Sequence, residues 1–228
     1  MAQQLALDLG GAPPASLANF IGNTEVVRAL NELLDSDCLG YGQQNIYLCG
    51  PPGSGRTHLL AAACAHVQRQ GQMSCSLGSY SGTRDFSYST HVTLYTVDDV
   101  EQLDNLRQIA LFNLFNQIVP GQQKLICAGA EVPLGLKVRE DLRTRLAWGL
   151  VFRLNPLSDD EKITVLMQAA QARGLQLSHD VPTWLIKHYQ RDLRSLMRLL
   201  DALDQFSLEK KRAVTLPLMR ELFARLEE

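Results

Sequence analysis

A glycine-rich segment of eight residues has the residue types and spacing that most directly predict chemistry. It reads Gly50, Pro51, Pro52, Gly53, Ser54, Gly55, Arg56 and Thr57. It follows an apolar run and opens a segment of helical periodicity, which is the context that the phosphate-binding loop G-x-x-x-x-G-K-[ST] requires. Its glycines let main-chain N–H groups turn toward phosphate oxygens, and the dipole of the following helix adds to the attraction. The segment predicts binding of a di- or triphosphate, and a glycine-rich turn without a ligand is the alternative.

One position of the loop departs from the motif. Arg56 stands where lysine is expected, and arginine keeps the charge as a planar fork instead of a compact ammonium group. Thr57 supplies the hydroxyl that reaches Mg²⁺ in such loops, and His58 follows directly. We therefore expect nucleotide binding with slow or absent hydrolysis.

Two acidic residues, Asp98 and Asp99, follow the apolar run 92–97. An acid at the carboxyl end of a core strand can hold Mg²⁺ beside phosphates, and the next acid can orient a water molecule. Two acids after a strand also occur in solvated turns, but the upstream loop favours the functional interpretation because the two motifs serve one reaction. We expect Asp98 to join Thr57 as a metal ligand and Asp99 to be the second acid.

The elements that position these residues can be predicted from periodicity. Apolar runs typical of buried strands alternate with helical patterns as far as Pro156, which predicts an α/β fold with a parallel sheet flanked by helices. The expected strands are 45–49, 73–77, 92–97, 124–128 and 151–154, and the expected helices are 23–35, with Asn23 or Thr24 as the N-cap, 56–70 and 106–119.

After Pro156 the pattern predicts helices only. Ser158 and Glu161 form a capping box that opens a helix ending at Gly174, and three further helices follow at 180–189, 192–208 and 216–226. The predicted organisation is a flexible tail over 1–16, an α/β domain over 17–156 and a small all-helical domain over 157–228. Trp148 and Trp184 are expected in the core.

Composition excludes several classes of protein. The net charge is −2, and residues 157–228 hold 11 Lys and Arg against 11 Asp and Glu, so sequence-specific DNA binding is not expected. No apolar run is long enough to span a membrane and no secretion signal is visible, so we expect a cytoplasmic protein. The histidines show no metal-ligand spacing.

Two arginines and an N-terminal peptide remain. Arg145 precedes the fifth expected strand and Arg194 begins a helix; from spacing alone both are ordinary surface residues. Leucines alternate with other residues near the N-terminus, in the peptide Gln4, Leu5, Ala6, Leu7, Asp8, Leu9. Exposed apolar clusters mark interaction sites, and a disordered arm or an added edge strand is the alternative.

The order of these features resembles an AAA+ nucleotide-binding module, and more narrowly the DnaA branch of that family. Residues 142–149 (LRTRLAWG) are similar to the DnaA stretch with the arginine finger, and residues 19–23 (NFIGN) are similar to the segment that wraps the nucleotide base. Residues 4–9 are similar to the QLxLxL clamp-binding peptide of a regulatory member of this branch that shuts down DnaA after initiation. The resemblance covers nearly the whole chain.

The resemblance implies specific roles. A nucleotide, ADP or ATP with Mg²⁺, would be held by the loop 50–57 with His58, by Phe20, Ile21 and Asn23 of the base-wrapping segment, and by Arg194 as a sensor from a helical lid. Arg145 would act in trans at the ATPase site of DnaA. Gln4, Leu5, Leu7 and Leu9 would dock on the sliding clamp, the beta subunit of DNA polymerase III. Ala130 occupies the position of a polar sensor.

The resemblance thus implies a negative regulator of chromosomal replication initiation: an adaptor that stimulates ATP hydrolysis by DnaA and converts it to the ADP form. With Arg56 and Ala130 in its own site, we expect the chain not to act as an enzyme itself. The alternative is an autonomous AAA+ ATPase of the helicase-loader (DnaC-like) type, which measurable turnover by the purified chain would favour. The sequence leaves open whether the chain forms a homodimer.

Overall fold

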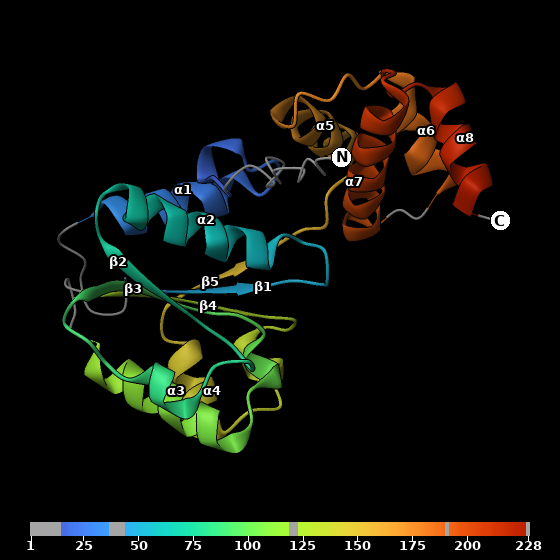
Figure 1. The fold of residues 1–228 in the computed structure, drawn as a ribbon. Helices are drawn as coiled ribbons and strands as arrows, with labels where there is room; N and C mark the ends of the chain where they lie inside the picture. The colour runs from blue at the N-terminus through green and yellow to red at the C-terminus, as the bar shows by residue number, and fades with distance from the viewer. Residues whose placement is uncertain (1–14, 37–43, 119–122, 190–191, 227–228) are drawn as a thin grey trace, which may run out of the picture. The chain divides into compact units, whose positions relative to one another are not determined.

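The computed structural model describes residues 15–36, 44–118, 123–189 and 192–226 (Figure 1). Main-chain contacts divide the chain into two units between Pro156 and Leu157. This is where the sequence pattern changes from alternating strands and helices to helices alone. Each unit has a hydrophobic core of its own.

The first unit is built on a sheet of five parallel strands in the order β2-β3-β4-β1-β5. The strands are β1 (Asn45–Cys49), β2 (Met73–Leu77), β3 (Val92–Val97), β4 (Lys124–Gly129) and β5 (Leu150–Arg153). The three central strands are buried on both faces, which explains why they read as continuous apolar runs. The edge strands β2 and β5 are largely exposed.

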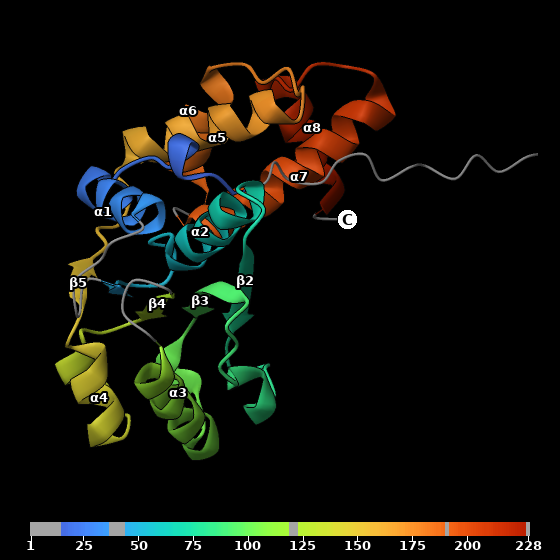
Figure 2. The same ribbon diagram turned by 90° about the vertical axis from the view of Figure 1, so that its left-hand side faces the viewer.

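Helices cover both faces of this sheet. The helices α1 (Thr24–Asp35) and α2 (Arg56–Arg69) pack on one face, and α3 (Asn105–Gln117) and α4 (Glu140–Leu146) pack on the other (Figures 1 and 2). Leu30 and Leu59 represent the core on the first face, and Leu111 and Leu142 represent the core on the second. The predicted parallel sheet with flanking helices is confirmed.

The sheet order explains how distant motifs come together. β1, β3 and β4 are adjacent strands, and because all strands run in parallel their carboxyl ends meet at one edge of the sheet. The loop 50–57 follows β1, Asp98 and Asp99 follow β3, and Ala130 follows β4. This edge is where open α/β sheets bind ligands.

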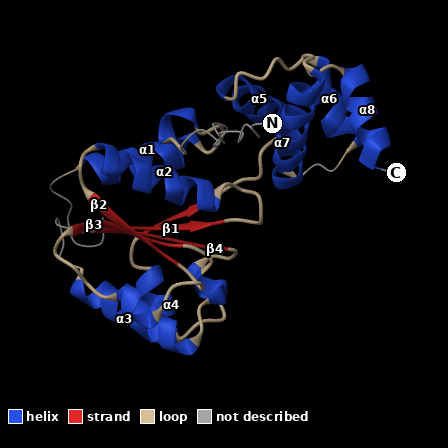
Figure 3. Ribbon diagram, in the orientation of Figure 1, coloured by secondary structure: helices blue, strands red, loops and turns tan. Residues whose placement is uncertain are grey.

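The second unit contains only helices around a separate core (Figure 3). They are α5 (Asp159–Ala172), α6 (Asp180–His188), α7 (Leu193–Lys210) and α8 (Leu216–Leu226). Gly174 ends the first of them with a φ of +70°, a conformation that favours glycine. Trp184 packs against this core, as expected. Among the described residues, no helix has both the length and the apolarity needed to cross a bilayer.

The capping box that opens α5 gives a stability prediction. The Ser158 hydroxyl accepts a hydrogen bond from the Glu161 N–H at 3.2 Å, and the Ser158 N–H donates to the Glu161 carboxylate at 2.7 Å. We expect Ser158→Ala to lower the free energy of unfolding by about 1 kcal/mol, measured by denaturant titration. Thr164→Ala is the control, because that hydroxyl bonds only the Asp160 carbonyl of its own helix. Equal losses in both variants would contradict a capping role.

Candidate functional site

The glycine-rich loop is shaped to expose main-chain N–H groups. Gly53 and Gly55 have φ angles of +81° and +94°, in the left-handed region where other residues are strained. A side chain on Gly55 would also lie 2.9 Å from the Phe20 ring. The Ser54 side chain is buried, and its hydroxyl has no hydrogen-bond partner among the described residues. A tight loop at a helix N-terminus with a buried donor left unsatisfied is suited to an anion such as phosphate.

Thr57 and Asp98 lie side by side at the end of the loop. The Thr57 hydroxyl donates to the Asp98 carboxylate over 2.6 Å. Both are hard oxygen ligands, and Mg²⁺ takes one or two such protein ligands together with phosphate oxygens and water. In the described part of the chain no cluster of three His, Cys, Asp or Glu side chains could hold a metal ion. The pair therefore fits Mg²⁺ that arrives with a nucleotide.

Arg56 is directed at acidic residues. One of its terminal nitrogens lies 3.1 Å from a carboxylate oxygen of Asp99, and the other lies 3.6 Å from a carboxylate oxygen of Glu101. Its side chain is only 11% exposed. The planar fork of arginine can bridge two carboxylates in this way, which a single ammonium group cannot do with the same geometry. The arginine in the lysine position thus pairs with the second acid.

Glu101 connects this ion pair to the end of β4. The Ala130 N–H donates to the Glu101 carboxylate at 3.0 Å. A side chain on Gly129 would lie 2.1 Å from the Tyr47 hydroxyl and 2.8 Å from Glu101, so only glycine fits there. The loop, the second acid and the expected sensor position are therefore joined through one carboxylate.

The segment expected to wrap a nucleotide base lies beside the loop. Phe20 is half-buried, and its ring centroid lies 5.8 Å from that of His58. Loss of hydration lowers the pKa of His58 and so favours its neutral ring, although the residue as a whole is exposed. Ile21 is also half-buried. Phe20 and Ile21 therefore form an apolar, uncharged surface beside the loop.

Asn23 has a different partner from the one expected of an N-cap. It precedes α1 with a φ of +47° and makes no side-chain capping bond. Instead, its amide donates to the Asn155 carbonyl at 3.2 Å and accepts from the Asn155 N–H at 2.9 Å. Asn23 is thus the N-cap residue, as predicted, but both polar groups of its side chain are used by one main-chain partner and none caps the helix.

Arg145 lies on α4 and stacks on aromatic rings. Its guanidinium carbon is 4.2 Å from the Trp148 ring centroid and 5.8 Å from that of Phe112. Within the described residues it forms no ion pair, whereas Arg143 lies 3.9 Å from the Glu140 carboxylate. Trp148 is 54% exposed, so its expected place in the core is wrong. The ring faces solvent because Trp148 follows α4 where the chain turns into the edge strand β5.

Two sets of predicted residues are not part of the described first unit. Arg194 is exposed in the first turn of α7 in the helical unit, where Asp192 caps the helix by accepting from the Ser195 N–H. Gln4, Leu5, Leu7 and Leu9 lie outside the described residues.

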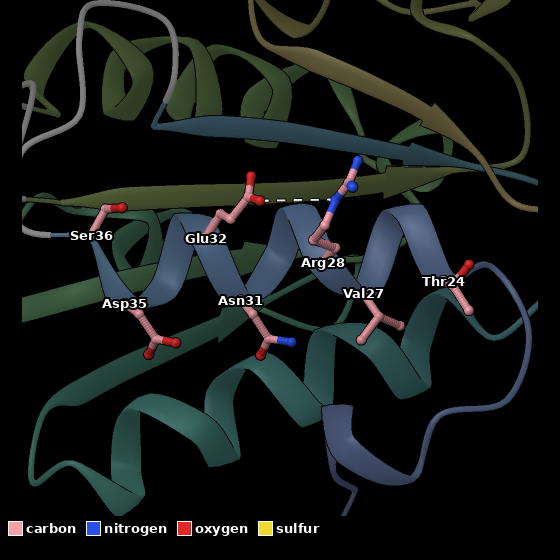
Figure 4. Close-up of a pocket in the computed structure, with 7 residues that line it drawn as sticks. All are labelled: Thr24, Val27, Arg28, Asn31, Glu32, Asp35 and Ser36. Atoms are coloured by element: carbon pink, nitrogen blue, oxygen red, sulfur yellow. Dashed lines mark ion pairs between the residues drawn. The ribbon is translucent and has the colours of Figure 1, made fainter.

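An open groove along α1 is separate from this site. Figure 4 shows its side chains on one face of the helix, with an ion pair between Arg28 and Glu32 at 3.9 Å. The lining residues are Thr24, Val27, Arg28, Asn31, Glu32, Asp35 and Ser36. It contains none of the phosphate-loop or acidic residues described above, so the chemistry belongs to the loop and not to this groove.

Solved structures with the same fold include replication proteins. Domain III of the Thermotoga maritima replication initiation protein DnaA has a TM-score of 0.78 at 18% identity, over 93% of this chain and 97% of that one. AMPPCP-bound DnaA from Aquifex aeolicus has a TM-score of 0.67 at 22% identity, over 88% and 69%. A variant of RuvB from Thermotoga maritima has a TM-score of 0.71 at 19% identity, over 93% and 72%. Proteins with different names share this fold, so the fold alone does not show which of their functions this chain has.

The helical unit gives a more specific similarity than the fold does. Residues 159–223 match the family model of the Hda lid domain. Over the whole chain, the similarity to these replication proteins is one of fold. The predicted fold, a parallel sheet flanked by helices and followed by a helical domain, is confirmed, and the match of residues 159–223 supports the predicted resemblance to the DnaA branch.

Two residues of the first unit were not assigned a functional role from the sequence. Glu101 is the third acid after β3, and its place in the series Asp98, Asp99, Val100, Glu101 is a signal that could have identified it. Trp148 is the exposed ring under Arg145, and only its position in the segment 142–149 could have suggested that contact.

Proposed function

We propose that this chain is a nucleotide-bound adaptor that regulates replication initiation negatively. In this proposal it binds the DNA polymerase III sliding clamp through Gln4, Leu5, Leu7 and Leu9, and it stimulates ATP hydrolysis by DnaA in trans. The relationship of its fold and lid to DnaA and Hda supports this choice of partner.

The presentation of Arg145 is the observation that most supports this function. An arginine supplied to the γ-phosphate of a neighbouring site stabilises the charge of the transition state. Arg145 is partly exposed at the end of a short helix, and its N–H donors are engaged by no carboxylate of the described residues. Arg143, two residues earlier, lies within ion-pair distance of Glu140 and is therefore the weaker candidate.

The chain's own site is proposed to hold ADP or ATP without efficient hydrolysis. The loop 50–57 and His58 would surround the phosphates, Phe20, Ile21 and Asn23 would lie toward the base, and Arg194 would contact the nucleotide from the lid. Thr57 and Asp98 would hold Mg²⁺, which neutralises phosphate charge. Asp99 would orient water in an active ATPase, but here Arg56 pairs with it at 3.1 Å. A site of this kind would set the conformation of the adaptor.

An autonomous ATPase of the helicase-loader type is the second candidate, because the Thr57 hydroxyl and the Asp98 carboxylate are adjacent, as a magnesium-dependent ATPase would need. Hydrolysis by the purified chain with single-stranded DNA, in the absence of DnaA, distinguishes the two. Turnover near 1 s⁻¹, within the ordinary range of enzymes, would support the second candidate and contradict the first.

The clamp contact gives a separate prediction. Changing Gln4 and Leu5 together to alanine should raise the concentration of chain needed for half-maximal stimulation of DnaA by roughly tenfold or more on clamp-loaded DNA, because a tether raises the local concentration of its cargo. The maximal rate should stay unchanged. ATP hydrolysis by DnaA, followed as a function of chain concentration, provides both values.

DNA without the clamp is the control for that experiment. Wild type and the double variant should be equally weak there. A double variant that matches wild type on clamp-loaded DNA would show that these residues do not tether the chain.

A further inference from the structure

Two aromatic rings contact the Arg145 guanidinium and restrict the directions in which it can point. The Trp148 ring centroid lies 4.2 Å from the guanidinium carbon, within the range of a cation–π contact, and Phe112 lies at 5.8 Å. Trp148 comes from the turn that follows α4 and Phe112 comes from α3, so two different parts of the fold contact the same guanidinium. The side chain is therefore held from more than one direction.

The way in which Arg145 is held differs from an ion pair. The five N–H donors of a guanidinium lie in its plane, whereas a ring contacts its face. Stacking therefore restrains the group without using its donors, while a carboxylate would use one or two of them. Arg145 has the first kind of partner, and Arg143 lies 3.9 Å from a carboxylate, the second kind.

The main chain that carries the Trp148 ring is fixed in the turn between α4 and β5. The Trp148 N–H donates to the Arg145 carbonyl at 3.1 Å, which places the ring one turn beyond the arginine. A side chain on Gly149 would lie 2.2 Å from the Asn45 carbonyl oxygen, so the main chain must pass directly against β1. Phe112 is packed against the core of the second face. The Phe112 ring is therefore held by the core, and the main chain that carries Trp148 is held against β1.

We propose that Trp148 is a positioning residue for Arg145. Its ring holds the guanidinium by one face, so that the in-plane donors can meet the γ-phosphate of a nucleoside triphosphate bound by another chain. The inference rests on the proposed function in trans. Its expected effect is on the rate at saturation, since ordering a side chain in advance lowers the entropy lost in reaching the transition state.

The maximal rate and the half-saturating concentration together distinguish a ring that positions Arg145 from a ring that only contacts the partner. Trp148→Ala should lower the maximal rate of DnaA stimulation about tenfold, which equals about 1.4 kcal/mol, with the half-saturating concentration nearly unchanged. Trp148→Phe keeps a ring face and should retain most of the stimulation. Leu150→Ala is the control, because Leu150 is a neighbouring apolar side chain that is 48% exposed. It should leave the maximal rate unchanged.

Several outcomes would overturn the proposal. A maximal rate that is unaffected by Trp148→Ala, or a change only in the half-saturating concentration, would mean that the ring serves contact alone. Loss of activity in Trp148→Phe equal to that in Trp148→Ala would exclude the stacking role. Thermal unfolding of each variant verifies that the exposed substitutions leave the fold intact.

A measurement on the chain alone distinguishes this failure from failure of the proposed function. In a Trp184→Phe background Trp148 is the sole tryptophan, and Arg145→Ala should increase its quenching by acrylamide because the guanidinium no longer covers one face. Unchanged quenching would exclude the stack. If the wild-type chain does not stimulate DnaA, the proposed function fails and the positioning role fails with it, whereas a quenching change would still establish the contact.

Discussion

Replacing Arg145 with alanine is expected to return ATP hydrolysis by DnaA to the rate of DnaA alone. An arginine finger that acts fully contributes roughly 10³–10⁵ in rate, so the stimulated component should fall below detection. Arg145 is the arginine of α4 that stacks on rings and forms no ion pair within the described residues. The measurement is single-turnover hydrolysis of ATP bound to DnaA, in the presence of DNA-loaded clamp and a saturating concentration of the chain.

Arg143→Ala is the matched control for this experiment. It removes the same charge from the same helix, but its guanidinium lies 3.9 Å from Glu140 and not over the rings. We expect it to retain stimulation. Arg145→Lys should be intermediate, because lysine keeps the charge but lacks the planar fork. Equal losses from Arg143→Ala and Arg145→Ala would point to a general charge effect and exclude a specific finger.

The second large effect is expected at Arg56. Arg56→Lys should increase nucleotide hydrolysis by the chain itself by roughly 10²-fold, the lower part of the range for a positioned general base. A lysine cannot bridge Asp99 and Glu101 as the two terminal nitrogens of Arg56 do, at 3.1 and 3.6 Å. Asp99 then keeps the Gln102 amide, which donates to it at 3.1 Å, but loses the competing guanidinium and is expected to orient water, and the ammonium group has the position that the phosphate-loop motif gives it. Phosphate release by the purified variant, without DnaA, is the measurement.

The double variant Arg56→Lys with Asp99→Asn tests the cause. It should lose the gained hydrolysis while still binding nucleotide, because the amide cannot act as the second acid. Nucleotide binding by each variant shows that the loop is intact. An Arg56→Lys variant that binds nucleotide but hydrolyses it no faster than wild type would contradict the role given to the Arg56–Asp99 pair.

Most of the fold could be predicted because its elements have strong local patterns. The buried strands of a parallel sheet read as apolar runs, and all five were located to within one residue at each end. Ser158 and Glu161 predicted the start of α5 because a capping box is a local motif. The helix α4 was missed. It has seven residues, and its N-cap, Arg139, offers no capping side chain.

The candidate site was predictable as a set of positions but not as a set of contacts. The sheet order brings the loop after β1, the acids after β3 and Ala130 after β4 together, as the motifs require. The Arg56 side chain points at Asp99 and Glu101 because those carboxylates lie close to it in the fold, and no sequence motif encodes that proximity. Trp148 was expected in the core because large aromatic residues are usually buried, yet its ring is largely exposed beneath a guanidinium.

The two hydrogen bonds at Asn155 fix the last residues of the first unit. The Asn155 N–H and carbonyl are both held by Asn23, the φ angle of Pro156 is locked by its ring, and the Ser158 N–H is held by Glu161. The end of the first unit is thus tied through main-chain groups to the segment beside the glycine-rich loop. A displacement of Asn23 by a ligand in that loop is therefore expected to reach Asn155 directly.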